Sequence, residues 1–294
     1  MAIRYLKHKE IDKEKWNFCV SNAVNSMIYG MSWYLDIVCE NWDALISDDY
    51  EAVMPLPWKK KFGLKYVYHP FFAQQLGVFY RKIADDQTYE FLQKIPKSFL
   101  KYDASLNYLN MIKKLSLNIK TNYVLSLNKS CEELAKNFSE NTRRNIKKSE
   151  KENLSLTESI SLETFFTIKK NNALTQLSDT QYGIMYRLIN ELITLSVGKI
   201  KGVVNENGEL IGAVFLVYFK SRITYLFSVS TEQGKDKKAM FWLINQLIKE
   251  NAGKQLMLDF EGSMIEGVAR FFKGFGSQKE TYYRYSKSKI PFFK

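Results

Sequence analysis

The stretch Gln255–Gly276, with the sequence QLMLDFEGSMIEGVARFFKGFG, has the pattern of a buried strand that leads into a short helix. Its beginning, Gln255–Phe260, is a mainly apolar run that Asp259 interrupts. Open α/β sheets usually place their functional groups where a core strand ends, so this stretch is the first place to look for a site. The apolar spacing i, i+3, i+4, i+7 that follows predicts a helix with one inward face, formed by Ile265, Val268, Ala269 and Phe272.

Two signals mark the ends of this predicted helix. Ser263 and Glu266 have the spacing of a capping box, in which both side chains accept hydrogen bonds from free N–H groups of the first turn. Gly274 is expected to adopt the left-handed conformation that ends a helix. Between strand and helix, Asp259 and Glu261 could accept a proton from an amine or orient an acceptor; the alternative is helix capping and a salt bridge to a nearby lysine.

The composition fits a folded protein with an anionic partner. Of the 294 residues, 46% are apolar, which is enough for the core of one large domain or two ordinary ones. The 43 basic and 31 acidic residues give a net charge of +12, which favours nucleic acid, phosphorylated small molecules or an anionic membrane surface. Three scattered cysteines and two distant histidines, His8 and His69, offer no metal-binding or redox spacing. We expect no metal site and no required cofactor.

The sequence shows no recognisable signal peptide, and no apolar run reaches the roughly 20 residues that span a bilayer. We therefore expect a cytoplasmic protein without a transmembrane segment. Peripheral contact with a membrane and the oligomeric state stay open.

The first half of the chain alternates short strands and helices. Trp58–Gly63 is a basic stretch that is predicted to be the loop between two strands. Its Lys59 and Lys60 could hold a phosphate or a carboxylate of an acceptor, although a basic hairpin tip is usually just solvated. The predicted strands are Ile3–Leu6, Glu51–Pro57, Lys65–Phe72, Gln74–Phe79, Ser98–Asp103 and Tyr123–Leu127, and the predicted helices are 12–24, 33–39 and 86–94.

Lys129–Glu152 is predicted to be a charged helical segment with a basic second half. Arg143 and Lys147 share one helical face, and Arg144 shares another with Lys148. The segment is therefore either a solvated helix that joins two halves or an anion-binding surface, in which the arginines could bind a phosphate bidentately.

The second half follows a clearer order. Asn207–Gly208 is a hairpin signal between two strands, and Gly234–Lys238 opens an amphipathic helix. The resulting order is two helices, three strands, a helix, a strand, a helix and a strand, which combines an antiparallel meander with a crossover to a parallel strand. The other predicted helices are 162–172 and 179–195, and the predicted strands besides 255–260 are 199–204, 210–219, 222–230 and 278–286.

This order resembles the core of the GNAT acyltransferase fold. More specifically, the chain resembles the FemABX group of peptidoglycan-bridge aminoacyltransferases and the related FemAB-like proteins. The resemblance covers residues 138–276 and rests on three segments, Phe138–Lys148, Asp259–Ser263 and Arg270–Gly276. Over residues 1–130 it rests on the general layout.

The resemblance implies an α+β fold of tandem GNAT-like domains, each a mixed, mainly antiparallel sheet flanked by helices. We expect an N-terminal domain at 1–128 and a C-terminal domain at 129–294, with 129–152 as a basic helical connector. The family further implies an acceptor cleft between the domains and a donor channel in the second.

The activity that the resemblance implies is that of a bacterial N-acyltransferase of the FemABX type, which transfers an aminoacyl or acyl group to an amine of a cell-wall or surface-glycan precursor. In that family the donor is aminoacyl-tRNA and the acceptor is a UDP-linked or lipid-linked muropeptide. The expected partners are therefore an anionic phosphorylated acceptor and tRNA. The alternatives are an acyl-CoA-dependent GNAT acetyltransferase and a non-catalytic basic binding module.

One departure from the pattern concerns the donor. GNAT enzymes that use acetyl-CoA hold its pyrophosphate on a Gln/Arg-x-x-Gly-x-Gly/Ala loop at a helix N-terminus. The corresponding turn here, Gln233–Ala239, has Asp236 where the first glycine of that pattern belongs, and a carboxylate disfavours a pyrophosphate. This weakens the acetyl-CoA interpretation and leaves Lys235, Lys237 and Lys238 as candidate donor-binding residues.

The resemblance also implies site residues. Lys273 matches the lysine of a Phe-Lys pair that lies by the aminoacyl ester in the Fem enzymes, so it is the first candidate to stabilise the oxyanion. The alternative is a surface lysine that interacts with the helix dipole. Asp259 and Glu261 complete the candidate catalytic set. The candidate substrate-binding residues are Arg143, Arg144, Lys147, Lys59, Lys60, Phe272, Tyr68 and Tyr225, and the two tyrosines are either walls of the acceptor cleft or ordinary core residues.

Overall fold

The computed structural model describes residues 2–82, 86–115, 117–172, 176–262 and 265–289. The chain divides into two compact units: unit 1 is Met1–Lys120 with Thr281–Lys294, and unit 2 is Thr121–Glu280. The sequence predicts the boundary between the two domains after residue 128. Strands β7 (Asn118–Ser126) and β13 (Gln278–Ser288) each contain residues of both units, so no linker composition marks either boundary.

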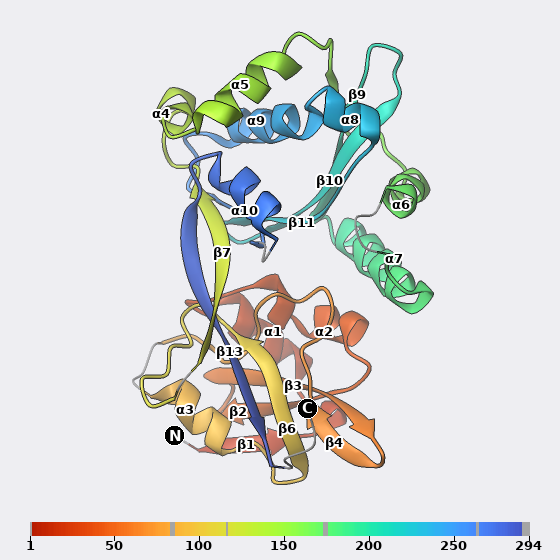
Figure 1. Cartoon of the computed structure of the whole chain (residues 1–294). Coiled ribbons are helices and arrows are strands. Elements are labelled where there is room, and N and C mark those ends of the chain that lie inside the picture. Colours follow the sequence, from red (N-terminus) through yellow and green to blue (C-terminus); the bar gives the residue numbers. More distant parts are fainter. Residues whose placement is uncertain (1, 83–85, 116, 173–175, 263–264, 290–294) are drawn as a thin grey trace. The chain divides into compact units, whose positions relative to one another are not determined.

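Unit 1 is a mainly antiparallel sheet with short helices beside it (Figure 1). Its further elements are β1 (Ile3–Leu6), η1 (His8–Glu10), α1 (Lys13–Ser21), η2 (Ile28–Gly30), α2 (Ser32–Val38), β2 (Trp42–Ser47), β3 (Ala52–Lys61), β4 (Leu64–Val67), β5 (Phe79–Tyr80), α3 (Gln87–Gln93) and β6 (Phe99–Leu106). The strand order is β1-β2-β3-β4-β6-β13, and β5 pairs with β3. β4 and β6 are parallel, whereas β13 runs antiparallel to β6.

In unit 2 the strands are mixed in direction and follow the order β13-β7-β12-β11-β10-β9-β8. Its further strands are β8 (Ser155–Thr157), β9 (Gly198–Val204), β10 (Leu210–Phe219), β11 (Arg222–Ser230) and β12 (Met257–Asp259). Its helices are α4 (Cys131–Lys136), α5 (Glu140–Ser149), α6 (Leu162–Asn171), α7 (Asp179–Thr194), α8 (Glu232–Asp236), α9 (Ala239–Asn251) and α10 (Glu266–Lys273). None of the helices described in either unit is long and apolar enough to cross a membrane.

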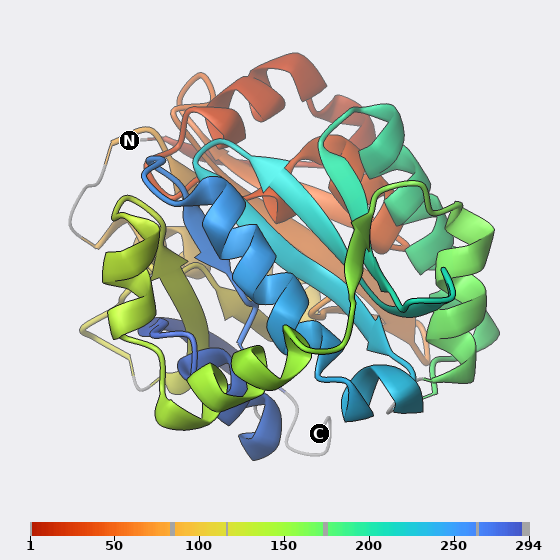
Figure 2. The ribbon, with the colours of Figure 1, turned by 90° about the horizontal axis from the view of Figure 1, so that it is seen from above.

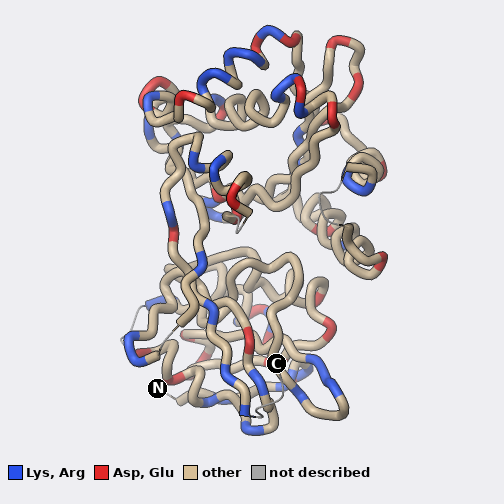
Figure 3. Tube along the Cα trace, viewed as in Figure 1, with Lys and Arg blue, Asp and Glu red and all other residues tan. Residues whose placement is uncertain are grey.

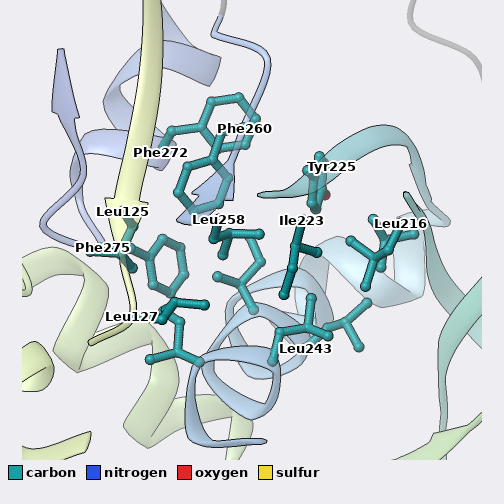
Figure 4. Packing of buried hydrophobic residues seen from close by; sticks show 14 of the residues in the cluster. Leu125, Leu127, Leu216, Ile223, Tyr225, Leu243, Leu258, Phe260, Phe272 and Phe275 are labelled. Atoms are coloured by element: carbon teal, nitrogen blue, oxygen red, sulfur yellow. The ribbon is translucent and has the colours of Figure 1, made fainter. Parts of the chain in front are cut away.

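The core of unit 2 lies between α9 and one face of this sheet. Leu243 of α9 packs with Leu125, Ile223 and Leu258, which come from three neighbouring strands (Figure 4). α5 packs on α9 in turn (Figure 2). Local signals start five helices of unit 2, each of which begins after a Ser or Thr whose hydroxyl accepts a hydrogen bond from a backbone N–H of the first turn, namely Ser130 (α4), Ser139 (α5), Ser161 (α6), Ser178 (α7) and Thr231 (α8).

Strand β12, which follows the crossover helix α9, pairs with each of its two neighbouring strands over three residues. It is parallel to β11 over Arg222–Thr224 and antiparallel to Val124–Ser126 of β7. Beyond Thr224, β11 continues to Ser230 paired with β10, with a bulge at Leu226. Within the described residues, the second half of β11 therefore has one edge without a strand neighbour.

The predicted α+β class, with mainly antiparallel sheets flanked by helices, is confirmed. Three predictions in unit 1 are wrong. Of the predicted strand Gln74–Phe79, only Phe79 belongs to a strand, β5. Trp58–Lys61, expected as a loop, forms the end of β3, and Phe62 and Gly63 alone make the turn to β4. Strand β2 was missed because Asp43 and Ser47 interrupt its apolar pattern, although all six of its residues are buried.

The predicted ends of the last helix also need correction. Gly274 has a right-handed conformation, with φ of −58°, and Gly276 has the left-handed one, with φ of +75°. α10 begins at Glu266 after the N-cap residue Ile265. The other member of the expected capping box, Ser263, lies outside the described residues.

Candidate functional site

Four polar side chains form a hydrogen-bonded cluster in unit 2, one from each of four neighbouring strands. Arg222 of β11 donates from Nη1 to Asp259 Oδ2 of β12 at 2.6 Å, and from Nη2 to Glu280 Oε1 of β13 at 2.8 Å. Asn122 Nδ2 of β7 donates to Asp259 Oδ1 at 2.8 Å and to Glu280 Oε2 at 3.1 Å. The cluster therefore joins the two carboxylates through an arginine and an amide.

The strand register explains why these side chains meet. Arg222 pairs with Met257, which lies two residues before Asp259, and Asn122 lies two residues before Val124, the partner of Asp259. Residues two apart in a strand point to the same face of the sheet, where diagonal neighbours are within reach of long side chains. The cluster therefore occupies the face opposite the apolar core, whose members alternate with these residues.

The environment of Asp259 favours a structural role. Its side chain is 1% exposed, and its oxygens accept hydrogen bonds from Arg222, Asn122 and the backbone N–H of Glu261. Burial alone would lower the pKa of Arg222, but the attraction of Asp259 and Glu280 outweighs it and raises that pKa above its usual range. Arg222 is therefore charged. Of the two predicted roles, the ion pair fits this geometry better, with an arginine in place of the expected lysine.

Glu261 occupies a strained turn directly after β12. Its φ is +54°, which is uncommon for a residue with a side chain, and Gly262 has the same φ. A Cβ on Gly262 would lie 2.4 Å from the carbonyl oxygen of Thr121, so only glycine lets the turn approach β7 this closely. Glu261 is half-buried. It differs in this from Asp259, whose side chain is almost completely buried.

Lys273 is the exposed last residue of α10. Its Nζ lies 5.6 Å from the centroid of the Tyr123 ring. The preceding Phe272 is buried and stacks on Phe260, with ring centroids 4.7 Å apart, and it lies edge-on to Tyr225 at 5.7 Å. Burial raises the pKa of Tyr225 above its usual range, so its phenol stays protonated within this aromatic group.

The sequence segments around α5 and α10 that carried the resemblance meet in unit 2. The N–H of Ser139 donates to the carbonyl oxygen of Gly274 at 2.8 Å, and the rings of Phe138 and Phe275 lie 5.5 Å apart. A Cβ on Gly274 would lie 2.2 Å from Thr142 Oγ1. The turn that follows Lys273 is therefore fixed against the start of the basic helix.

The predicted anion-binding residues of α5 lie on its solvent side. Thr142 and Ile146 are buried, whereas Arg143, Arg144 and Lys147 are exposed. In the part of the chain that the structure describes, Arg143 and Lys147 form no ion pair. These two cations are available to an anionic ligand.

Of the three candidate donor-binding lysines, Lys235 lies within α8 and the other two follow it directly; α8 is a short helix that occupies the turn in which the GNAT pattern has a loop. Lys237 Nζ lies 3.2 Å from a carboxylate oxygen of Glu152 and 3.0 Å from one of Glu206. Lys235 pairs with a glutamate of its own helix, and Lys238 Nζ donates to the carbonyl oxygen of Lys235. Two of these three ammonium groups are thus neutralised by carboxylates.

The remaining predicted residues belong to unit 1. Lys59 Nζ lies 3.4 Å from Glu40 Oε2 and 5.0 Å from the centroid of the Tyr68 ring. Tyr68 accepts a hydrogen bond from the Glu40 N–H at 3.3 Å. Lys60 is exposed. The structure brings Lys59 and Tyr68 together within this unit, and it brings the turn after Lys273 against the start of α5 within unit 2.

Sequence reasoning missed several polar residues of unit 2. Three of them, Arg222, Asn122 and Glu280, lie in strands whose sequences show no clear alternation of polar and apolar residues. The sequence therefore contains no sign that their side chains share one face of the sheet. Lys169 of α6 donates from Nζ to the carbonyl oxygen of Ser228 at 2.6 Å, at the unpaired edge of β11, and burial lowers its pKa. In the described part of the chain, no group of three His, Cys, Asp or Glu residues could hold a metal ion.

No protein-family model matches the sequence, and no curated protein matches it. Solved structures do match. FemX is 12% identical with a TM-score of 0.69, over 96% of this chain and 97% of that one. L-PGS from Bacillus licheniformis is 12% identical with a TM-score of 0.56, over 95% and 92%. A tandem GNAT protein from the clavulanic acid biosynthesis pathway is 9% identical with a TM-score of 0.55, over 99% of each chain.

At these identities the likeness shows the fold. The chain shares its fold with FemX, L-PGS and a tandem GNAT protein, so the fold that the sequence motifs indicated is confirmed.

Proposed function

We propose that this chain is an N-acyltransferase of the FemABX type, which transfers an aminoacyl or acyl group to an amine of a cell-wall or surface-glycan precursor. One observation carries the proposal: Phe260 and Phe272 stack at 4.7 Å, and the residues that follow them in the chain are Glu261 and Lys273. The stack therefore places the turn after β12, which contains Glu261, beside the last turn of α10, which contains Lys273. The shared fold with FemX and L-PGS supports the same class of reaction.

These two groups match the needs of acyl transfer. Glu261 takes the proton from the attacking ammonium, so that the nitrogen lone pair can form a bond to the acyl carbonyl carbon. Lys273 stabilises the negative charge that develops on the carbonyl oxygen. When the intermediate collapses, the bond to the donor oxygen or sulfur breaks, and the leaving group takes up a proton. The amide product and the free donor then leave.

The charges around this strand end favour an acceptor that carries both an amine and a phosphate. Arg222 contributes one positive charge to the polar cluster and Asp259 and Glu280 two negative ones, so the cluster has an excess negative charge beside Glu261, which attracts an ammonium group. The exposed cations of α5 supply a separate attraction for phosphate. A phosphorylated precursor with a free amine fits both features.

The donor is proposed to be aminoacyl-tRNA. α8 occupies the turn in which acetyl-CoA-dependent enzymes hold the pyrophosphate, and Lys235 and Lys237 are paired with carboxylates. This observation weighs against acyl-CoA, which remains the second candidate because the fold is shared with a tandem GNAT protein.

A ligand panel tests the proposal. The melting temperature of the purified chain is measured with UDP-linked muropeptide, uncharged tRNA, acetyl-CoA and longer acyl-CoAs, because a ligand that binds the folded state raises it by mass action. We expect stabilisation by muropeptide or tRNA that Arg143→Ala reduces and Lys151→Ala, a nearby exposed lysine, preserves. Stabilisation by CoA esters alone would favour the acyl-CoA alternative. An unchanged melting temperature with every one of these ligands would favour a non-catalytic binding module with another partner.

A further inference from the structure

The turn between β3 and β4 exposes apolar side chains to solvent. We call Lys59–Tyr66 the hairpin tip. Phe62 is 89% exposed, the largest exposed fraction among the large apolar side chains that the structure describes, and Leu64 is 38% exposed. Both lie at or beside the two-residue turn. A single exposed apolar residue is common, but two at the end of a projecting hairpin form an apolar point.

The backbone of the turn makes this choice of residue unexpected. Phe62 has φ of +52° and Gly63 has φ of +77°, the arrangement of a two-residue hairpin turn that favours Asn-Gly. A bulky side chain is disfavoured in that conformation, and asparagine would fit without strain. Local folding preference therefore does not account for phenylalanine at the tip.

Lysines stand directly behind this apolar point. The segment Trp58–Val67 contains Lys59, Lys60, Lys61 and Lys65, and no acidic residue (Figure 3). Lys65 Nζ lies 3.9 Å from the centroid of the Trp58 ring, and Lys61 Nζ lies 5.8 Å from that of Phe62. Glu40, from another segment, offsets the charge of Lys59. The hairpin tip keeps a positive charge close to its apolar end.

We propose that the hairpin tip binds the surface of an anionic lipid bilayer. Phe62 and Leu64 enter the interfacial layer, where their apolar surface leaves water, and the lysines behind them contact lipid phosphates. The order along the hairpin, apolar end first and cations next, matches the order of a bilayer from acyl chains to headgroups. Long lysine side chains reach the headgroups while their methylene stems follow the apolar residues inward.

Nucleic acid is the competing partner, since aromatic residues interleaved with cations also bind single strands. The observations favour the membrane. Leu64 has no flat face on which a base could stack, and all four cations are lysines, whereas arginine is preferred for bidentate phosphate contacts and stacking. The proposal stands independently of acyl transfer.

The test is co-sedimentation of the full chain with vesicles of phosphatidylcholine alone or mixed equally with phosphatidylglycerol. We expect binding to the mixed vesicles that added salt weakens. Phe62→Asn, which leaves every charge in place, should lower the partition coefficient about tenfold. Lys60→Ala should lower it about fivefold. Phe18→Asn, which removes another exposed phenylalanine of unit 1, should leave it unchanged.

The variant design separates lost binding from lost folding. Because asparagine suits the left-handed conformation, Phe62→Asn should melt at the same or a higher temperature than the parent chain. Unchanged vesicle binding by Phe62→Asn would overturn the proposal, as would equal binding to both kinds of vesicle or to neither. Binding of single-stranded RNA that Phe62→Asn abolishes, without vesicle binding, would also overturn it and assign the hairpin tip to nucleic acid.

Discussion

Arg222 Nη1 lies 2.6 Å from Asp259 Oδ2 inside unit 2, and this ion pair joins the first residue of β11 to the last residue of β12. These strands pair over only three residues before β11 continues without β12. The ion pair therefore stabilises the point at which the two strands separate, and it fixes the turn that carries Glu261.

Removing the arginine should destabilise unit 2 strongly. Arg222→Met leaves the carboxylates of Asp259 and Glu280 buried without a counter-charge, which costs about 3–5 kcal/mol of unfolding free energy. Urea unfolding measures the loss. Lys249→Met serves as the control, because Lys249 lies 3.9 Å from Glu150 in an exposed pair and should contribute less than about 1 kcal/mol. Equal effects of the two variants would contradict a structural role for the cluster.

Substitutions of Glu261 and of Asp259 should affect different properties, the first the rate of acyl transfer and the second the thermal stability. Glu261→Gln removes the proposed proton acceptor, and we expect kcat/KM for acyl transfer to fall by about 100-fold or more while the melting temperature stays nearly constant. Asp259→Asn should instead lower the melting temperature, because it removes the charge that faces Arg222. Glu266→Gln, at an exposed pair with Arg270, is the matched control. Full activity in Glu261→Gln would assign proton transfer to another group.

Two glycines near Lys273 should respond in opposite directions to alanine. A Cβ on Gly274 would meet Thr142 Oγ1 at 2.2 Å, so Gly274→Ala should cost about 1–3 kcal/mol and displace the turn after Lys273. A Cβ on Gly267, within α10, meets nothing within 4 Å, so Gly267→Ala should stabilise the helix by about 0.5–1 kcal/mol. Thermal unfolding of both variants checks the contact between α5 and α10; a stabilising Gly274→Ala would contradict it.

His69 should make the stability of unit 1 depend on pH. Burial lowers its pKa from 6.5 to about 4, and the positive charge of Arg284 acts in the same direction. The unfolded chain takes up a proton at His69 as the pH falls below 6.5, whereas the folded chain does so near pH 4. The contribution of neutral His69 to the stability of unit 1 is therefore fully present above pH 6.5, and it is lost as the pH falls from 6.5 to about 4. The free energy of unfolding, measured with urea at about pH 7 and at about pH 5, should decline less between these two pH values in His69→Gln than in the parent chain.

Patterns confined to one element could be predicted from the sequence. The order of helices and strands in the second half follows from apolar periodicity and from turn signals such as Asn207–Gly208. The predicted helix 179–195 agrees closely with α7, which is Asp179–Thr194. Such signals depend on residues that are only a few positions apart, so they can be recognised in a single sequence.

Features that depend on contacts between distant segments could not be predicted. Gly274 follows the last residue of α10, as predicted, but its conformation is right-handed, and its missing Cβ makes room for Thr142, which lies far earlier in the sequence. A salt bridge of Asp259 to a nearby lysine was one of its two predicted roles, but its actual partner Arg222 comes from another strand and could not be identified from the sequence. The turn Phe62–Gly63 was read as the end of a longer loop, because three lysines precede it and hide the end of β3.

The most direct test of acyl transfer is single-turnover kinetics with a labelled aminoacyl-tRNA and a UDP-linked muropeptide. Lys273→Met is compared with Lys129→Met, which removes an exposed loop lysine of the same unit. The parent chain and Lys129→Met should form the amide product at similar rates, and Lys273→Met should form it at least 100-fold more slowly with unchanged donor binding. Equal rates in both variants, or no product from the parent chain with this donor and with acyl-CoA, would contradict the proposed reaction.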